Sequence, residues 1–112
     1  MALMVLVVTR NVVFWDHINQ PTDMINQFIG TITDDDIRII LRDAKQWNLN
    51  MLGFLHPAEN TVFNRKQVEQ LRPELEILKK KSMVRKEAIQ IIEKGIEMVA
   101  DSNRLYLQFE GD

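Results

Sequence analysis

The chain has 112 residues, of which 46% are apolar and 27% charged, with a formal net charge of −2 and no cysteine. This length and apolar content predict one globular domain over residues 1–112, with a core of its own. The lack of cysteine excludes disulfides, thiol catalysis and cysteine-ligated metal sites. The near-neutral charge argues against a general nucleic-acid-binding protein.

The N-terminal segment is an apolar run rich in valine. It predicts a buried strand over residues 3–8, because β-branched side chains favour extended backbone. A secretion signal is the alternative, but the run has no basic flank and no small-residue cleavage site. The run is also far shorter than the ~20 residues that a membrane helix needs. We therefore expect a cytoplasmic protein that does not enter a membrane.

A second strand is predicted over residues 12–15, joined to the first by a hairpin at Arg10 and Asn11. Trp15 ends this strand. It is a candidate for core packing or for contact with a partner, because tryptophan is over-represented among interface hot spots. Pro21 can then open a short helix, and Gly30 is expected to stop it.

The next helix has a well-marked start. Thr33 is a suitable N-cap, Asp36 occupies the capping-box position, and three consecutive aspartates favour the positive end of a helix dipole. Apolar residues continue at helical spacing to Trp47, which predicts a helix over residues 33–48. A short strand is predicted over residues 51–55.

A strand is also predicted over residues 61–63. Asn64 follows it and caps a predicted helix over residues 64–80, with Gln67 at the capping-box position. Pro73 lies inside this pattern. It should kink or split the helix, because proline lacks the backbone donor and clashes with the preceding turn.

The last helix is predicted over residues 83–101, with Ser82 as its cap. Gly95 inside it costs about 1 kcal/mol relative to alanine, unless it permits close packing. The two consecutive helices should form an antiparallel hairpin.

The chain closes with a predicted strand over residues 105–109, because apolar and polar residues alternate there. We expect Leu105, Leu107 and Phe109 to face the core and Tyr106 to face the opposite side. The fold class is therefore α+β. A small, mostly antiparallel sheet carries three to four helices, including a C-terminal helical hairpin followed by a closing strand.

No motif of catalysis is visible in the sequence. His17 and His56 fit no metal-ligand spacing, and there is no glycine-rich phosphate loop or serine nucleophile elbow. The triple aspartate at residues 34–36 fits helix capping better than a cation site. We therefore expect no enzyme, no metal and no cofactor. The alternative is a small enzyme with a pocket formed by scattered residues, namely Asp16, His17, His56 and Glu110.

Charge is unevenly distributed along the chain. Residues 1–63 hold 4 basic and 7 acidic residues (−3), residues 64–86 hold 8 and 3 (+5), and residues 87–112 hold 2 and 6 (−4). Such segregation favours a charged protein partner. The candidate contact residues are the acidic strand end, a basic cluster between the last two helices, and one tryptophan: Glu110, Asp112, Lys79, Lys80, Lys81, Arg85, Lys86 and Trp15.

Two motifs support a more specific hypothesis: Thr-Val-Phe-Asn at residues 61–64 with Gln67, and the closing Leu-Tyr-Leu-Gln-Phe-Glu-Gly-Asp at residues 105–112. This pair resembles a pattern in small uncharacterised bacterial proteins, some of which are suspected immunity proteins of secreted toxins. The resemblance covers residues 59–112. It implies a non-enzymatic protein that neutralises a cognate toxin by occluding it. A homo-oligomeric module, in which the helical hairpin forms a homodimer, is the alternative.

Overall fold

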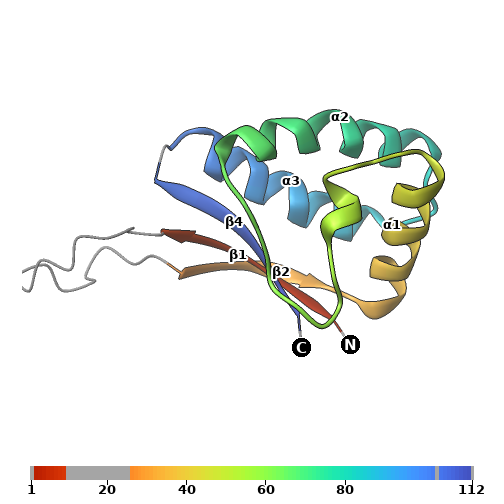
Figure 1. The fold of residues 1–112 in the computed structure, drawn as a ribbon. Coiled ribbons are helices and arrows are strands. Elements are labelled where there is room, and N and C mark those ends of the chain that lie inside the picture. Colours follow the sequence, from red (N-terminus) through yellow and green to blue (C-terminus); the bar gives the residue numbers. More distant parts are fainter. Residues whose placement is uncertain (1, 10–25, 103, 112) are drawn as a thin grey trace, which may run out of the picture.

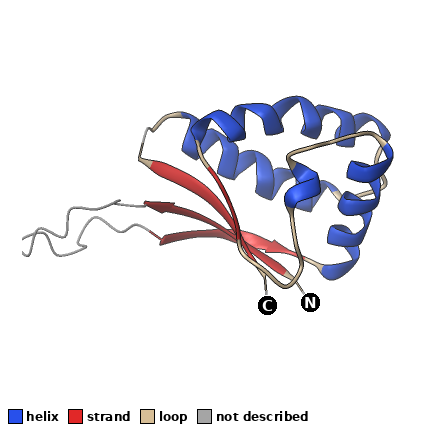
Figure 2. Cartoon of the chain, viewed as in Figure 1, coloured by secondary structure: helices blue, strands red, loops and turns tan. Residues whose placement is uncertain are grey.

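Four antiparallel strands form one sheet in the order β2-β1-β4-β3, and the helices gather on one side of it (Figures 1 and 2). The computed structural model describes residues 2–9, 26–102 and 104–111. The elements, in chain order, are β1 (Leu3–Thr9), β2 (Asn26–Ile32), α1 (Asp34–Gln46), the 3-10 helix η1 (Leu52–Phe54), β3 (Thr61–Phe63), α2 (Arg65–Lys81), α3 (Lys86–Ala100) and β4 (Leu105–Glu110). The predicted α+β class is confirmed within these residues.

The closing strand β4 lies between β1 and β3, so both of its edges are hydrogen-bonded. Leu107 and Phe109 are completely buried under the helices. The ring of Phe109 meets the ring of Phe63 edge-on, with centroids 5.8 Å apart. Leu105 is half-buried and packs against the same core. The strand predicted over residues 105–109 is therefore confirmed, together with its buried face.

Strand β2 corrects one prediction. Residues 26–30 were expected to end a helix, but they pair with β1 as a strand, while residues 21–25 lie outside the described part. Gly30 is not a helix stop. A Cβ on Gly30 would lie only 2.8 Å from Cδ1 of Ile91 on α3, so glycine here permits α3 to approach the sheet. The hairpin predicted at residues 10–11 and the strand at 12–15 also lie outside the described residues.

Helix α1 begins as predicted, because the Thr33 side chain accepts from the backbone N–H of Asp36. The strand predicted over residues 51–55 is wrong, since this segment contains η1. The conformation of this segment is held by a residue that lies far away in the sequence. The two carboxylate oxygens of Glu74 on α2 accept from the backbone N–H groups of Met51 and Leu52, each at 2.9 Å.

Helix α2 starts with the predicted capping box. Asn64 Oδ1 accepts from the backbone N–H of Gln67, and Gln67 Oε1 accepts from the backbone N–H of Asn64, both at 2.9 Å. Pro73 does not split the helix, which runs unbroken through it. Both halves of α2 carry buried apolar side chains, such as Leu71 and Leu75, that hold the helix to the core on either side of the proline.

Ser82 closes α2 instead of opening α3, which begins at Lys86 with Arg85 in the cap position. The Ser82 hydroxyl donates to Asp43 Oδ2 and accepts from the backbone N–H of Val84. Ser82 is therefore used to fix the connection between α2 and α3 to α1. The prediction that it caps the last helix is wrong.

Gly95 lies inside α3, where glycine was expected to cost stability unless it permits close packing. The structure shows close packing at this position. A Cβ on Gly95 would lie 2.5 Å from Cδ1 of Leu107 in β4. The absence of a Cβ at Gly95 therefore leaves room for the Leu107 side chain of β4, and its absence at Gly30 leaves room for the Ile91 side chain of α3. Helix α3 consequently lies close to the sheet and contacts β1, β2 and β4.

We expect Asn64→Ala to lower the free energy of unfolding by about 1 kcal/mol, because it removes the acceptor for the Gln67 N–H. Chemical denaturation measures the loss. Gln70→Ala is the matched control, since Gln70 is an exposed position on the same helix. Equal stability of the two variants would contradict the capping role.

Candidate protein-binding surfaces

One face of the sheet lies opposite the helices, and we call it the outer face (Figure 2). Strand alternation places on it the following residues: Met4, Leu6, Val8, Phe28, Thr31, Val62, Tyr106, Gln108 and Glu110. Six of the nine are apolar or aromatic, and Glu110 is the only charged one. Phe28 is 55% exposed and Met4 is 39% exposed. Val8, at 6% exposure, is the buried exception. The part of the outer face around Phe28 and Met4 is therefore an apolar surface that the described helices leave uncovered.

The exposure of this surface is not evident from the sequence pattern. The N-terminal run is apolar at successive positions, which is typical of a strand covered on both faces. In the structure, the helices cover the side that carries Leu3, Val5 and Val7, each completely buried, whereas Met4 on the other side is 39% exposed. One feature of the sequence could have indicated an apolar outer face. Met4, Leu6 and Val8 alternate with the buried residues and are equally apolar.

Glu110 lies at the margin of the outer face, opposite Met4 of β1. It is half-buried and makes no ion pair within the described residues. Asp112, the other acidic candidate, and Trp15, the tryptophan candidate, both lie outside the described residues. Within the described residues, the acidic strand end is represented by the carboxylate of Glu110, which borders an apolar surface.

The glycine of the closing motif has a structural explanation. A Cβ on Gly111 would lie 2.6 Å from the backbone nitrogen of Glu59 and 2.7 Å from the carbonyl oxygen of Pro57. The backbone after β4 thus packs directly against the turn before β3. His56 belongs to the same turn, where its Nδ1 accepts from the backbone N–H of Ala58 at 3.1 Å.

The cations of the basic cluster between α2 and α3 differ in whether they already have a partner within the fold. Lys79 donates to Glu93 at 2.5 Å and to Glu76 at 3.1 Å. These hydrogen bonds raise the pKa of Lys79 above its ordinary value, and the bond to Glu93 has the largest effect. The ammonium group of Lys81 lies 5.8 Å from the ring centroid of Trp47, in a cation–π arrangement.

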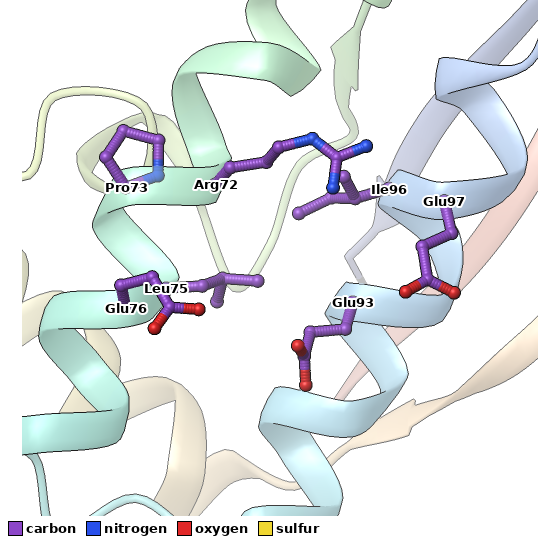
Figure 3. Close-up of a pocket in the computed structure, with 7 residues that line it drawn as sticks. All are labelled: Arg72, Pro73, Leu75, Glu76, Glu93, Ile96 and Glu97. Atoms are coloured by element: carbon purple, nitrogen blue, oxygen red, sulfur yellow. The ribbon is translucent and has the colours of Figure 1, made fainter.

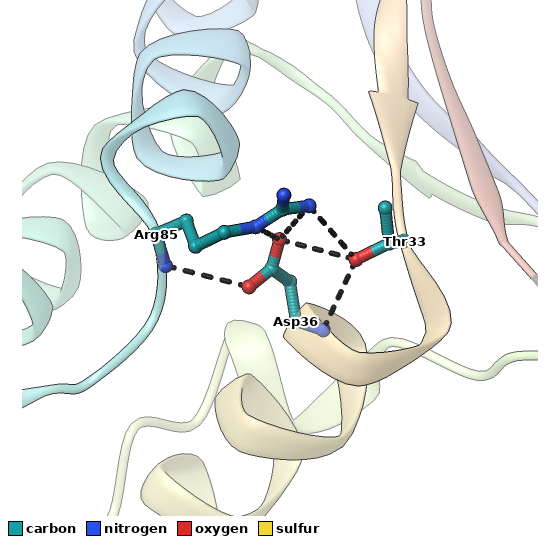
Figure 4. Close-up of polar contacts among 3 residues, drawn as sticks. All are labelled: Thr33, Asp36 and Arg85. Carbon is teal, nitrogen blue, oxygen red and sulfur yellow. Dashed lines mark hydrogen bonds and ion pairs between the residues drawn. The ribbon is translucent and has the colours of Figure 1, made fainter.

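Arg85 is engaged within the fold (Figure 4). Its Nε donates to Asp36 Oδ2 at 2.9 Å, and its backbone N–H donates to Asp36 Oδ1 at 3.3 Å. A terminal nitrogen of the guanidinium also donates to Thr33 Oγ1 at 3.2 Å. Because Asp36 is only 2% exposed, this pair ties the start of α3 to the start of α1. Arg85 therefore has a structural role that its sequence context did not reveal.

Two cations of the cluster are available to a partner. Lys80 and Lys86 are exposed and have no ion pair among the residues that the structure describes. Lys86 also borders a cleft of about 490 Å³ beneath the α2–α3 connection, which we call the tip cleft. Buried apolar side chains of Leu78, Val84 and Ile89 form its floor.

A smaller cavity of about 200 Å³ lies between α2 and α3 (Figure 3). Arg72 extends from α2 across its mouth, and Glu93 and Glu97 border it from α3. Most of these charges are already compensated, since Arg72 pairs with Glu69 and Glu93 pairs with Lys79. This cavity is therefore a weaker candidate than the tip cleft.

No group of three or more His, Asp or Glu side chains within the described residues is placed to hold a metal ion. None of the helices in the same residues has the length and apolar content to cross a membrane. Of the residues of the alternative enzyme pocket, Asp16 and His17 lie outside the described part of the chain.

Comparisons of the chain with known protein families, with curated proteins and with solved structures return no match.

Proposed function

We propose that this protein is a non-enzymatic binding domain that engages a protein partner through the outer face of its sheet. In its most concrete form it is an immunity protein that occludes a bacterial toxin, as the resemblance of residues 59–112 implies. The observation that carries the proposal is the exposure of Phe28 and Met4 on one apolar surface. Continuous apolar surface of this kind is typical of protein–protein interaction sites.

The composition of the face also supports a protein partner. Aromatic residues and methionine are enriched at the centres of interfaces and charged residues are depleted there. The outer face has this distribution, with Phe28, Met4 and Tyr106 on the sheet and Glu110 at its margin. A marginal carboxylate suits a basic cleft such as a nuclease active site. It would speed association more than it adds affinity.

Where a secreted protein is encoded directly upstream, the test measures binding to the C-terminal domain of that protein. We expect Phe28→Asp to weaken this binding about 100-fold, since it removes a central apolar contact and buries a charge. Phe54→Asp is a matched control, because Phe54 is 61% exposed but belongs to η1 and not to the outer face. Biolayer interferometry gives both dissociation constants.

Loss of binding in the Phe54 variant alone would exclude the outer face. Absence of binding by the upstream domain to the unaltered protein would contradict the toxin assignment.

Glu110→Lys should slow association with a basic partner and make the rate less dependent on salt. An unchanged association rate would exclude Glu110 as a steering contact.

A homodimer is the second candidate function. It is favoured by the near absence of charge on the outer face, which lets two copies meet without like-charge repulsion. Light scattering distinguishes it from the first candidate. A mass that rises with concentration in the unaltered protein, and not in Phe28→Asp, would indicate that a second copy covers this face.

A further inference from the structure

We propose that the tip cleft binds a short acidic segment of another protein, seated through one apolar side chain. This site is formed by α2, α3 and their connection, whereas the outer face is formed by the strands. The inference therefore does not rest on the proposed function.

The shape of the cleft sets the size of its occupant. Its volume of about 490 Å³ lies within the range of small-ligand pockets, about 300–1,000 Å³. Leu78, Val84 and Ile89 are each no more than 7% exposed, and they give the cleft an apolar floor. Such a floor accommodates one leucine-sized or phenylalanine-sized side chain and the backbone on either side of it.

The charge at the rim sets the chemistry of the flanking residues. Lys79 and Glu93 line one part of the rim, and their charges compensate each other. Lys86 lines the cleft without an ion pair among the described residues, and Lys80 is exposed next to Lys79. The charged side chains that line the cleft are thus two lysines and one glutamate, a formal charge of +1, which favours carboxylates beside the apolar anchor.

Contacts to α1 hold the cleft in shape. The Ser82 hydroxyl is bound to Asp43, and Arg85 is bound to Asp36, so both ends of the connection are fixed to buried carboxylates. A site that is already ordered loses less conformational entropy when a ligand binds. This makes specific binding of a short segment feasible in spite of the small contact area.

The connection also offers an adaptable apolar contact. Met83 lies between two cleft-lining residues and is 83% exposed, which is the highest exposure among the large apolar side chains described. Methionine is flexible and polarisable, and it is over-represented on surfaces that bind varied apolar partners. Met83 does not itself line the cleft, so it would contact only a segment that extends beyond the cleft past Ser82 and Val84.

The test uses a phage-displayed library of random heptapeptides, selected on the full chain. We expect enrichment of sequences with one large apolar residue flanked by aspartate or glutamate. Fluorescence polarisation then gives the affinity of an enriched peptide, which should fall as salt concentration rises. No enrichment, or enrichment of basic or uncharged sequences, would overturn the proposal.

Matched variants locate the binding site. Lys86→Glu should weaken the enriched peptide about tenfold or more. Lys94→Glu should leave the affinity within about twofold, because Lys94 is exposed on the same helix but does not line the cleft. Gln90→Trp should also weaken binding, since Gln90 lines the cleft and a larger side chain there would fill it.

Thermal denaturation of each variant shows that its fold is retained. Equal effects of the Lys86 and Lys94 substitutions, or full affinity in Gln90→Trp, would exclude the cleft. Phe28→Asp must retain peptide binding. This variant thus separates failure of the cleft proposal from failure of the outer-face proposal.

Discussion

A chain that ends after residue 103 is expected to lose cooperative unfolding altogether. The truncation removes β4, which is hydrogen-bonded to β1 on one edge and β3 on the other. It also removes Leu107 and Phe109, both completely buried. Each such side chain contributes roughly 1.5–3 kcal/mol, and the total stability of a small domain is about 5–15 kcal/mol. A sheet that loses a central strand leaves β3 with no partner among the described strands.

Thermal denaturation followed by circular dichroism measures the effect. A pair of point substitutions on β4 supplies the matched comparison. Leu107→Ala should cost about 2–5 kcal/mol, because it leaves a cavity under α3. Gln108→Ala should cost less than about 0.5 kcal/mol, because Gln108 lies on the outer face. A cooperative transition that persists in the truncated chain would show that β4 is peripheral to the fold.

The parts of the fold that follow from local sequence were predictable. The capping box of Asn64 and Gln67 lies within four consecutive residues, and so does the N-cap of α1 at Thr33. Strand β4 carries its own alternating pattern over six residues. In each case the residues that determine the structure are neighbours in the chain, so their spacing alone indicates the element.

The errors have a common physical cause, since the deciding contacts join distant segments. The sequence suggests that Gly30 stops a helix, but glycine is needed there for another reason. A larger residue would clash with the side chain of Ile91 on α3, which is distant in the sequence. Residues 51–55 were expected to extend, but a carboxylate on α2 binds two of their N–H groups. Neither contact leaves a signal in the local sequence.

The same reasoning applies to the candidate contact residues. Sequence spacing identified the basic cluster, but it could not show that Arg85 is bound to Asp36 or that Lys79 is bound to Glu93. The tip cleft depends on how α2 and α3 pack. The outer face depends on which side of the sheet the helices cover. The sequence therefore sufficed to predict that Lys80 and Lys86 are exposed cations. It did not suffice to predict the tip cleft or the outer face.

Glu74 is the residue for which the structure predicts a large effect that the sequence did not suggest. Its side chain is nearly buried at 9% exposure, and its two oxygens each accept a backbone N–H at 2.9 Å. Hydrogen bonds to charged groups are worth about 1.5–3 kcal/mol each. Glu74→Ala leaves the N–H of Leu52, a completely buried residue, without an acceptor. We expect a loss of about 3 kcal/mol in the free energy of unfolding.

Chemical denaturation of two further variants tests this explanation. Glu69→Ala is the matched control on α2, where the exposed pair with Arg72 is worth less than about 1 kcal/mol. Glu74→Gln keeps one acceptor oxygen and should fall between the unaltered protein and Glu74→Ala. Hydrogen exchange of the Leu52 amide should accelerate in Glu74→Ala more than exchange in β4 does, because the lost contact is local. If Glu74→Ala and Glu69→Ala are equally stable, the carboxylate does not hold η1 against α2, and the conformation of residues 51–55 must have another origin.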